Sequence, residues 1–163
     1  MVVQTKTSKS RFQKAKISGR DAEEAIMGVL SGDDPALIPQ AIASLGGMKS
    51  RKALVELMRI VCSHDLLLKT LPLKIEAVTS IGMIGDRQVV PILTELLDER
   101  RIIAGSRWEQ LKIAIAGCLA RLADDRALPV LKKKSHGSGE LSRACAEAVE
   151  AIERTGGSQH GGA

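Results

Sequence analysis

The sequence predicts an all-α fold, a right-handed α-solenoid of about 3.5 helical hairpins with about eight helices. Apolar residues recur at helical spacing on both sides of residues 84–86, Ile-Gly-Asp. The pattern also repeats along the chain. A forward shift of 38 residues places Pro91 on Pro129, and a backward shift of 36 residues places Ile81 on Leu45. A period of this size, with two helices in each unit, is typical of stacked helical repeats.

The N-terminal segment is strongly basic. Six Lys and Arg residues and no acid lie between Met1 and Arg20, while the rest of the chain is close to neutral, so this segment accounts for the net charge of +5. We expect residues 1–17 to form a disordered basic tail. Its simplest interpretation is a solubilising leader, and the alternative is a contact with nucleic acid or with an acidic partner.

The repeat domain is expected over residues 18–154. Its first helix, 21–30, is short and amphipathic, and it occupies the place of the second helix of an incomplete leading repeat. Asp34 is a candidate cap for a helix over 35–45 that begins with Pro35. The partner of that helix is expected over 50–61.

The central hairpin, 73–97, shows the turn chemistry most clearly. Gly85 suits the left-handed residue that ends its first helix, and Asp86 can cap the second. In the next unit, Ser106 and Glu109 predict a capping box at the start of a helix that runs to Leu122.

The chain is expected to close with two further helices. The partner of the long helix is short, at 125–133, and an alanine-rich helix follows over 140–154. Its glutamates recur on one side, as the polar outer face of a terminal repeat requires. Residues 155–163 are expected to form a flexible tail.

Two stretches of the sequence resemble HEAT repeats, of the short bacterial type that also occurs in phycobilin lyases. These are AVTSIGMIGDRQVVPILTELL, residues 77–97, and AGCLARLADDRALPVLKKK, residues 116–134. Both have a small residue before the turn, an aspartate in the turn and a proline inside the following apolar run. The earlier unit has Ser50 for the aspartate and Val55 for the proline. The resemblance implies a scaffold in a bacterial protein and identifies no activity.

The composition favours a cytoplasmic protein without a membrane segment. No apolar run approaches the roughly 18 residues that a membrane-spanning helix needs. Cys62, Cys118 and Cys145 lie far apart and have no CxxC spacing, which suits reduced thiols in a reducing compartment.

We expect no enzymatic activity, no cofactor and no metal. The three histidines do not belong to a zinc motif, and the chain has neither a phosphate-binding glycine loop nor a paired nucleophile and base. A bilin-lyase-like role, which only the resemblance suggests, is disfavoured because aromatic residues for packing a tetrapyrrole are scarce.

Nucleic-acid binding is the main alternative to protein binding. A basic edge could neutralise several phosphates of duplex DNA if its candidate residues gather in space. The candidates are Lys74, Arg100, Arg101, Arg107, Lys112 and Lys134. One Trp, one Phe and no Tyr leave little for stacking on bases, which argues against this alternative.

The favoured function is a non-catalytic scaffold that binds another protein through the concave face of its second helices. The outward positions there are polar and mixed in sign, which suits a weak or regulated partner. They are Lys52, Glu56, Arg59, Pro91, Thr94, Glu95, Lys132 and Lys133. The inter-repeat loops are the other candidate surface. We expect their apolar residues, 66–68 and 102–103, to tuck over repeat junctions, whereas open loops would support self-association.

Overall fold

The computed structural model describes residues 19–32 and 34–157, and every regular element in this part of the chain is helical. The α-helices are α1 (Gly19–Leu30), α2 (Ile38–Gly47), α3 (Leu54–Cys62), α4 (Leu71–Ile84), α5 (Val90–Asp98), α6 (Gly105–Leu122), α7 (Leu128–Ser135) and α8 (Glu140–Gly157). Short 3₁₀ turns precede α3, α5 and α7, namely η1 (Arg51–Ala53), η2 (Arg87–Val89) and η3 (Asp125–Ala127). The all-α prediction and the number of helices are confirmed for these residues. The predicted tail 1–17, and the part of the C-terminal tail from residue 158 on, lie outside them.

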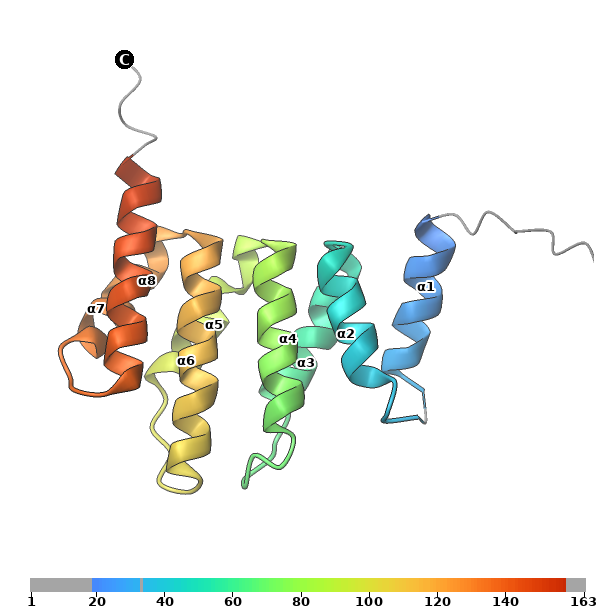
Figure 1. Cartoon of the computed structure of the whole chain (residues 1–163), viewed down its shortest axis with the longest axis horizontal. Helices are drawn as coiled ribbons and strands as arrows, with labels where there is room; N and C mark the ends of the chain where they lie inside the picture. Colours follow the sequence, from blue (N-terminus) through green and yellow to red (C-terminus); the bar gives the residue numbers. More distant parts are fainter. Residues whose placement is uncertain (1–18, 33, 158–163) are drawn as a thin grey trace, which may run out of the picture.

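The helices stack side by side in two rows (Figure 1). The first helices, α2, α4, α6 and α8, form one row in which each contacts the next. The second helices lie behind them, and each packs against the first helix of the following unit: α3 on α4, α5 on α6 and α7 on α8. Each unit therefore covers the apolar face of its neighbour, which is the arrangement of an α-solenoid. The right-handed twist stays a prediction.

The core runs along the stack between the two rows. Leu45, Ile81 and Leu119, which the repeat period aligns, are fully buried on successive first helices, and Ile152 of α8 is fully buried as well. Burying an aliphatic side chain of this size contributes about 1.5–3 kcal/mol. The apolar period read from the sequence is thus the period of the core.

The turns inside the hairpins follow one pattern. The carboxylates of Asp86 and Asp124 accept hydrogen bonds from the backbone amides two residues on, both at 3.0 Å. Ser50 stands at the equivalent place in the first hairpin, where its hydroxyl accepts from the amide of Ala53 at 3.3 Å. Gly85 has a φ of 79°, which confirms the predicted left-handed stop of α4. Asp86 is a cap, as predicted, but of the 3₁₀ turn η2 that leads into α5.

Arginines beside these caps connect successive turns. Arg51 lies 3.2 Å from the carboxylate of Asp86 in the next hairpin. Arg87 donates to the carbonyl of Leu122 at 3.0 Å, and Arg126 donates back to the carbonyl of Arg87 at 2.9 Å. The turns are therefore linked along the whole length of the stack.

Four predicted helix starts differ from the structure. The second helices expected from residues 50 and 125 begin at Leu54 and Leu128, after the 3₁₀ turns η1 and η3. Two first helices also begin elsewhere than predicted. Asp34 does accept a hydrogen bond from the amide of Ala36, at 3.0 Å, but this closes a separate turn, and α2 begins only at Ile38. The expected capping box at Ser106 is absent because α6 starts at Gly105, after Ala104 in the left-handed region. Helix α8 also extends to Gly157, three residues beyond its predicted end.

Helices α2 and α4 approach each other closely at Gly46. The hydroxyl of Ser80 on α4 is fully buried and donates to the carbonyl of Ile42 on α2 at 3.0 Å. A β-carbon on Gly46 would lie 2.6 Å from that hydroxyl oxygen and 2.9 Å from the Ser80 α-carbon. The absence of a side chain at Gly46 is what permits this spacing of the two helices.

Candidate functional site

The exposed positions of α3, α5 and α7 form one surface, which we call the second-helix face. Of the residues predicted there, Glu56 and Thr94 are half-buried and the others are exposed: Lys52, Arg59, Pro91, Glu95, Lys132 and Lys133. Several of these charges have partners within the chain. Arg59 pairs with Glu56 at 2.6 Å, and Lys132 with Glu153 of α8 at 2.7 Å.

Apolar residues also lie on the second-helix face, and of these the sequence pattern had indicated only Pro91 as exposed. Val55 on α3 is 74% exposed and Ile92 on α5 is 43% exposed. Pro91 and Pro129, which align with Val55 at the repeat period, are exposed as well. We call these four residues the apolar stripe. Val55, Pro91 and Pro129 are each the second residue of their helix, and Ile92 follows Pro91. This repeated position was the feature of the sequence that could have indicated their exposure.

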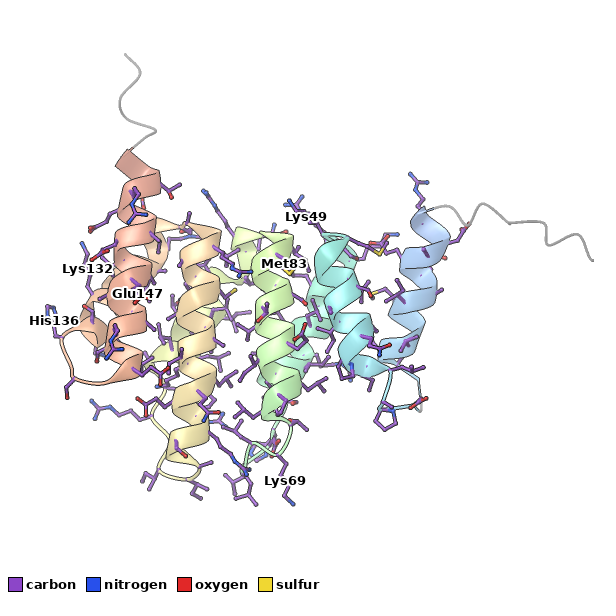
Figure 2. The ribbon with its side chains drawn as sticks, viewed as in Figure 1. Lys49, Lys69, Met83, Lys132, His136 and Glu147 are labelled. Carbon is purple, nitrogen blue, oxygen red and sulfur yellow. The ribbon has the colours of Figure 1, made fainter. Side chains whose placement is uncertain are left out.

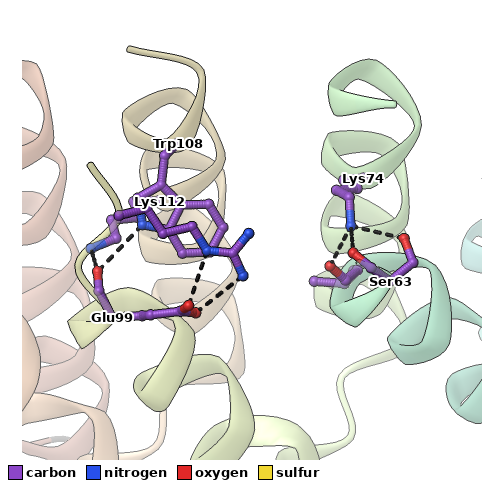
Figure 3. A network of polar contacts seen from close by, with 7 residues as sticks. Ser63, Lys74, Glu99, Trp108 and Lys112 are labelled. Carbon is purple, nitrogen blue, oxygen red and sulfur yellow. Dashed lines mark hydrogen bonds and ion pairs between the residues drawn. The ribbon is translucent and has the colours of Figure 1, made fainter. Parts of the chain in front are cut away.

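Lys74 and Lys112 do not belong to an exposed basic edge, so that part of the prediction is wrong. The side chain of Lys74 is only 1% exposed, and its ammonium donates to the carbonyls of Ile60, Val61 and Ser63 at 2.7–3.1 Å (Figure 3). These carbonyls end helix α3, so Lys74 serves as a buried cap for the helix before its own. Burial lowers its pKa from the usual value.

Lys112 does the same one repeat later (Figure 3). Its ammonium and the indole nitrogen of Trp108 both donate to the carbonyl of Glu99, which follows the last residue of α5. Burial lowers the pKa of Lys112 as well, and Lys134 adds to that effect. Lys74 and Lys112, which are 38 residues apart, therefore each bind the carbonyl end of the preceding helix.

The other residues of the predicted basic edge contact different groups of the protein. Arg101 pairs with Glu99 at 3.0 Å and lies over the Trp108 ring, 4.2 Å from its centroid. Arg107 donates to the carbonyl of Leu67 at 2.9 Å. Lys134 pairs with Asp98 at 2.9 Å, and Arg100 is exposed. Of the predicted basic edge, the side chain of Arg100 alone is thus exposed without an ion pair or hydrogen bond to another described residue.

The apolar residues of the inter-repeat loops are open, contrary to the prediction that they tuck over the junctions. Only Leu68 is buried, while Leu66, Leu67 and Ile103 are about half exposed and Ile102 is fully exposed. Both loops lie at the lower end of the stack, where Figure 2 also shows Lys69. A left-handed residue in each loop, Leu68 or Ala104, turns the chain before the following helix.

These two loops enclose a groove of about 440 Å³. It is lined by His64, Leu66, Glu99, Arg100, Arg101, Ile102 and Ile103. On the other side of Ile102 lies a second groove of about 400 Å³, which Trp108 and Leu141 also line. We call the two together the loop-end groove.

The ion pairs of Asp98 predict a pH-dependent stability. Hydrogen bonds from Lys134 and Lys133 lower the pKa of this carboxyl to about 2. Because the pKa is lower in the folded protein, the ion pairs of Asp98 contribute to the free energy of unfolding at pH values above the ordinary carboxyl range. This contribution is lost as the pH falls toward 2. The unfolding free energy of wild type should therefore exceed that of Asp98→Asn at pH 6, and the difference should shrink to zero near pH 2. Urea unfolding across this range measures it.

The double exchange of Lys133→Met and Lys134→Met provides the control for that prediction. In this background Asp98→Asn should add no further pH dependence, because the donors that lower the pKa are gone. A difference between wild type and Asp98→Asn that stays constant from pH 6 to pH 2 would contradict the role of these pairs.

The three thiols are free and differ in access. Cys118 and Cys145 are buried, and burial raises the pKa of Cys118 to about 12. At pH 8 such a thiol has only about one thiolate in 10,000 molecules, and the thiolate is the reactive form. We expect a disulfide reagent to label Cys62 alone in the native protein and all three cysteines after unfolding. Cys62→Ser should abolish the native reaction, and rapid native labelling of Cys118 would refute the prediction.

In the described part of the chain, no three His, Cys, Asp or Glu side chains lie close enough together to hold a metal ion. None of the helices in residues 19–32 and 34–157 combines the length and the apolar character that a membrane crossing requires.

Stacked helical hairpins with a common turn, a common core position and a repeated lysine cap define a helical repeat protein. Residues 73–99, which contain α5 and all but the first two residues of α4, match the family model of the PBS lyase HEAT-like repeat. The central hairpin is thus a HEAT-like repeat, as the resemblance predicted for this part of the chain. No curated protein matches it.

Proposed function

We propose that this protein is a non-catalytic scaffold that binds another protein through its second-helix face. The observation that carries the proposal is the apolar stripe, which runs across three successive second helices with Val55 and Ile92 open to solvent. An apolar centre surrounded by charged residues is the usual composition of a protein interface. The HEAT-like repeat is consistent with this use, since such repeats serve as helical interaction modules.

The charges beside the stripe support a selective partner. Arg59, Glu95 and Lys133 occupy equivalent positions on α3, α5 and α7, so their signs alternate along the stack. A partner would need the complementary order of charges to approach without repulsion. Arg59 and Lys133 already form ion pairs within the chain. A partner protein would have to replace these pairs by ion pairs of its own, so its affinity would be moderate.

Three free thiols support a reducing compartment as the place of action, and we propose the cytoplasm of a bacterium.

Photo-crosslinking in cells of the source organism tests the proposed face. A photoreactive phenylalanine analogue is placed at Val55 or at Ile92, and the matched control carries it at Met83, which is similarly exposed but lies on a first helix. We expect one discrete protein adduct from both test positions and none from Met83. The same adducts from all three positions, or none from Val55 and Ile92, would contradict the proposal.

A further inference from the structure

The loop-end groove is a second candidate docking surface, at a different place from the second-helix face. It lies between the loop that follows α3 and the loop that follows α5, at the lower end of the two rows. Its apolar rim consists of Leu66, Ile102 and Ile103, all of which are exposed. The volume of about 440 Å³ is in the range of about 300–1,000 Å³ that is common for ligand sites.

Hydrogen bonds from buried or neighbouring residues hold both loops in place. Lys74 binds the start of the first loop through the carbonyl and the hydroxyl of Ser63, at 2.7 and 2.9 Å. Lys112 and Trp108 hold the start of the second loop at the carbonyl of Glu99 (Figure 3). Arg107 then connects the second unit to the first loop at Leu67. The groove is therefore formed before any ligand arrives, which lowers the entropy that binding must overcome.

Cations without an ion-pair partner lie in the groove and in one of its loops. Arg100 lines both grooves, and Lys69 belongs to the loop that carries Leu66. Among the described residues, neither side chain has an ion-pair partner. Of the nearby carboxylates, Glu99 pairs with Arg101, Asp65 accepts two hydrogen bonds from Thr70 at 2.8 Å, and Glu109 lines the second groove. The surface therefore offers apolar contacts together with an excess of positive charge.

We propose that the loop-end groove binds an acidic, amphipathic segment of a partner protein. Apolar side chains of that segment would occupy the two grooves on either side of Ile102, which extend from Leu66 to Leu141 on α8. Its carboxylates would pair with Arg100 and Lys69. The length of this surface suits a short helix or an extended segment, because a single side chain could fill only one of the two grooves.

Charge disfavours a second copy of the chain as the occupant. In a two-fold dimer the same surface patch lies on both sides of the interface, so its excess of positive charge would meet the same excess on the second copy. Like charges placed across an interface repel.

Selection from a random 16-residue peptide library, displayed on phage and presented to the full chain, tests the proposal without presupposing a sequence. Peptides that bind the double variant Arg100→Glu, Ile102→Ser are removed in each round. We expect the remaining binders to combine net negative charge with several large apolar residues. Binders that are neutral or basic, or no binders that depend on these two residues, would overturn the proposal.

Fluorescence anisotropy with the best peptide then locates the site. Ile102→Ser and Arg100→Glu should each weaken binding at least tenfold, and Met83→Ser, at the other end of α4, should leave it unchanged. All three positions are exposed, so the fold should tolerate the changes, and thermal unfolding checks this. A peptide in which lysines replace the acidic residues should regain affinity for Arg100→Glu. Equal loss with Met83→Ser, or no loss with Ile102→Ser, would refute the site.

Two parallel measurements identify the other occupants. Binding to vesicles that contain 30% phosphatidylserine, if abolished by Ile102→Ser, would replace the proposal by a membrane contact. Sedimentation velocity that shows a concentration-dependent dimer, again abolished by Ile102→Ser, would replace it by self-association. None of these results bears on the second-helix face, which the crosslinks at Val55 and Ile92 test separately.

Discussion

Replacing Gly46 by alanine is expected to lower the free energy of unfolding by about 2–3 kcal/mol, in the upper part of the range of about 1–3 kcal/mol for overpacking a well-packed core. The new methyl group would lie 2.7 Å from the β-carbon of Ser80 and 2.9 Å from its α-carbon. Backbone atoms cannot move aside as the end of a flexible side chain can, so helices α2 and α4 must separate. Equilibrium unfolding in urea, followed by circular dichroism at 222 nm, measures the loss.

The neighbouring glycine is the matched control. A β-carbon at Gly47 would have no atom within 4 Å outside its own helix, and Gly47 is the last residue of α2. Gly47→Ala should leave stability unchanged or raise it by up to about 0.5–1 kcal/mol, because alanine favours the helix more than glycine does. Equal effects of the two substitutions would show that the close approach at Ser80 does not limit the packing of α2 on α4.

Replacing Lys74 by methionine is expected to lower the free energy of unfolding by about 2–3 kcal/mol. Methionine fills a similar volume, so the change removes the charged donor and leaves the cavity small. The carbonyls of Val61 and Ser63 would lose the ammonium that they now bind at 2.9 and 2.7 Å. A hydrogen bond to a charged group contributes about 1.5–3 kcal/mol, and an acceptor left unsatisfied keeps its desolvation cost.

Lys69→Met provides the comparison in the same loop. Lys69 is exposed and its loss should change stability by less than about 0.5 kcal/mol, as is usual for surface positions. Hydrogen exchange adds a local readout: Lys74→Met should speed the exchange of amides at the end of α3 before those of the core. If both variants unfold at the same urea concentration as wild type, Lys74 does not stabilise the helix end.

The hairpins could be predicted because their determinants are local and repeated. Gly85 and Asp86 lie next to each other in sequence and act on backbone groups within a few residues. The apolar period likewise reports on one helix at a time. The wrong helix starts, at Asp34 and Ser106, are of the same local kind. Asp34 closes a separate turn before α2 begins, and a left-handed alanine, Ala104, starts α6 before Ser106.

The roles of the lysines and of the loop residues could not be predicted in the same way. Lys74 and Lys112 looked like surface charges, since nothing in their own helices indicates that carbonyls of another helix lie within reach. Ile102 looked like a residue for a repeat junction, although the backbone path after α5 carries it into solvent. A pattern along one helix contains no information about the neighbour that approaches it.

The amino-acid order was therefore sufficient for the helices, the turns, the repeat period and the class of fold, because these depend on contacts within one hairpin. The distribution of charge and of open apolar surface was decided when the hairpins stacked. Stacking buries Lys74 and Lys112 against helix ends, engages Arg101 and Lys134, and leaves Ile102 open. The physical reason is that solvation of a side chain depends on every element around it, whereas helix formation depends mainly on neighbours in sequence.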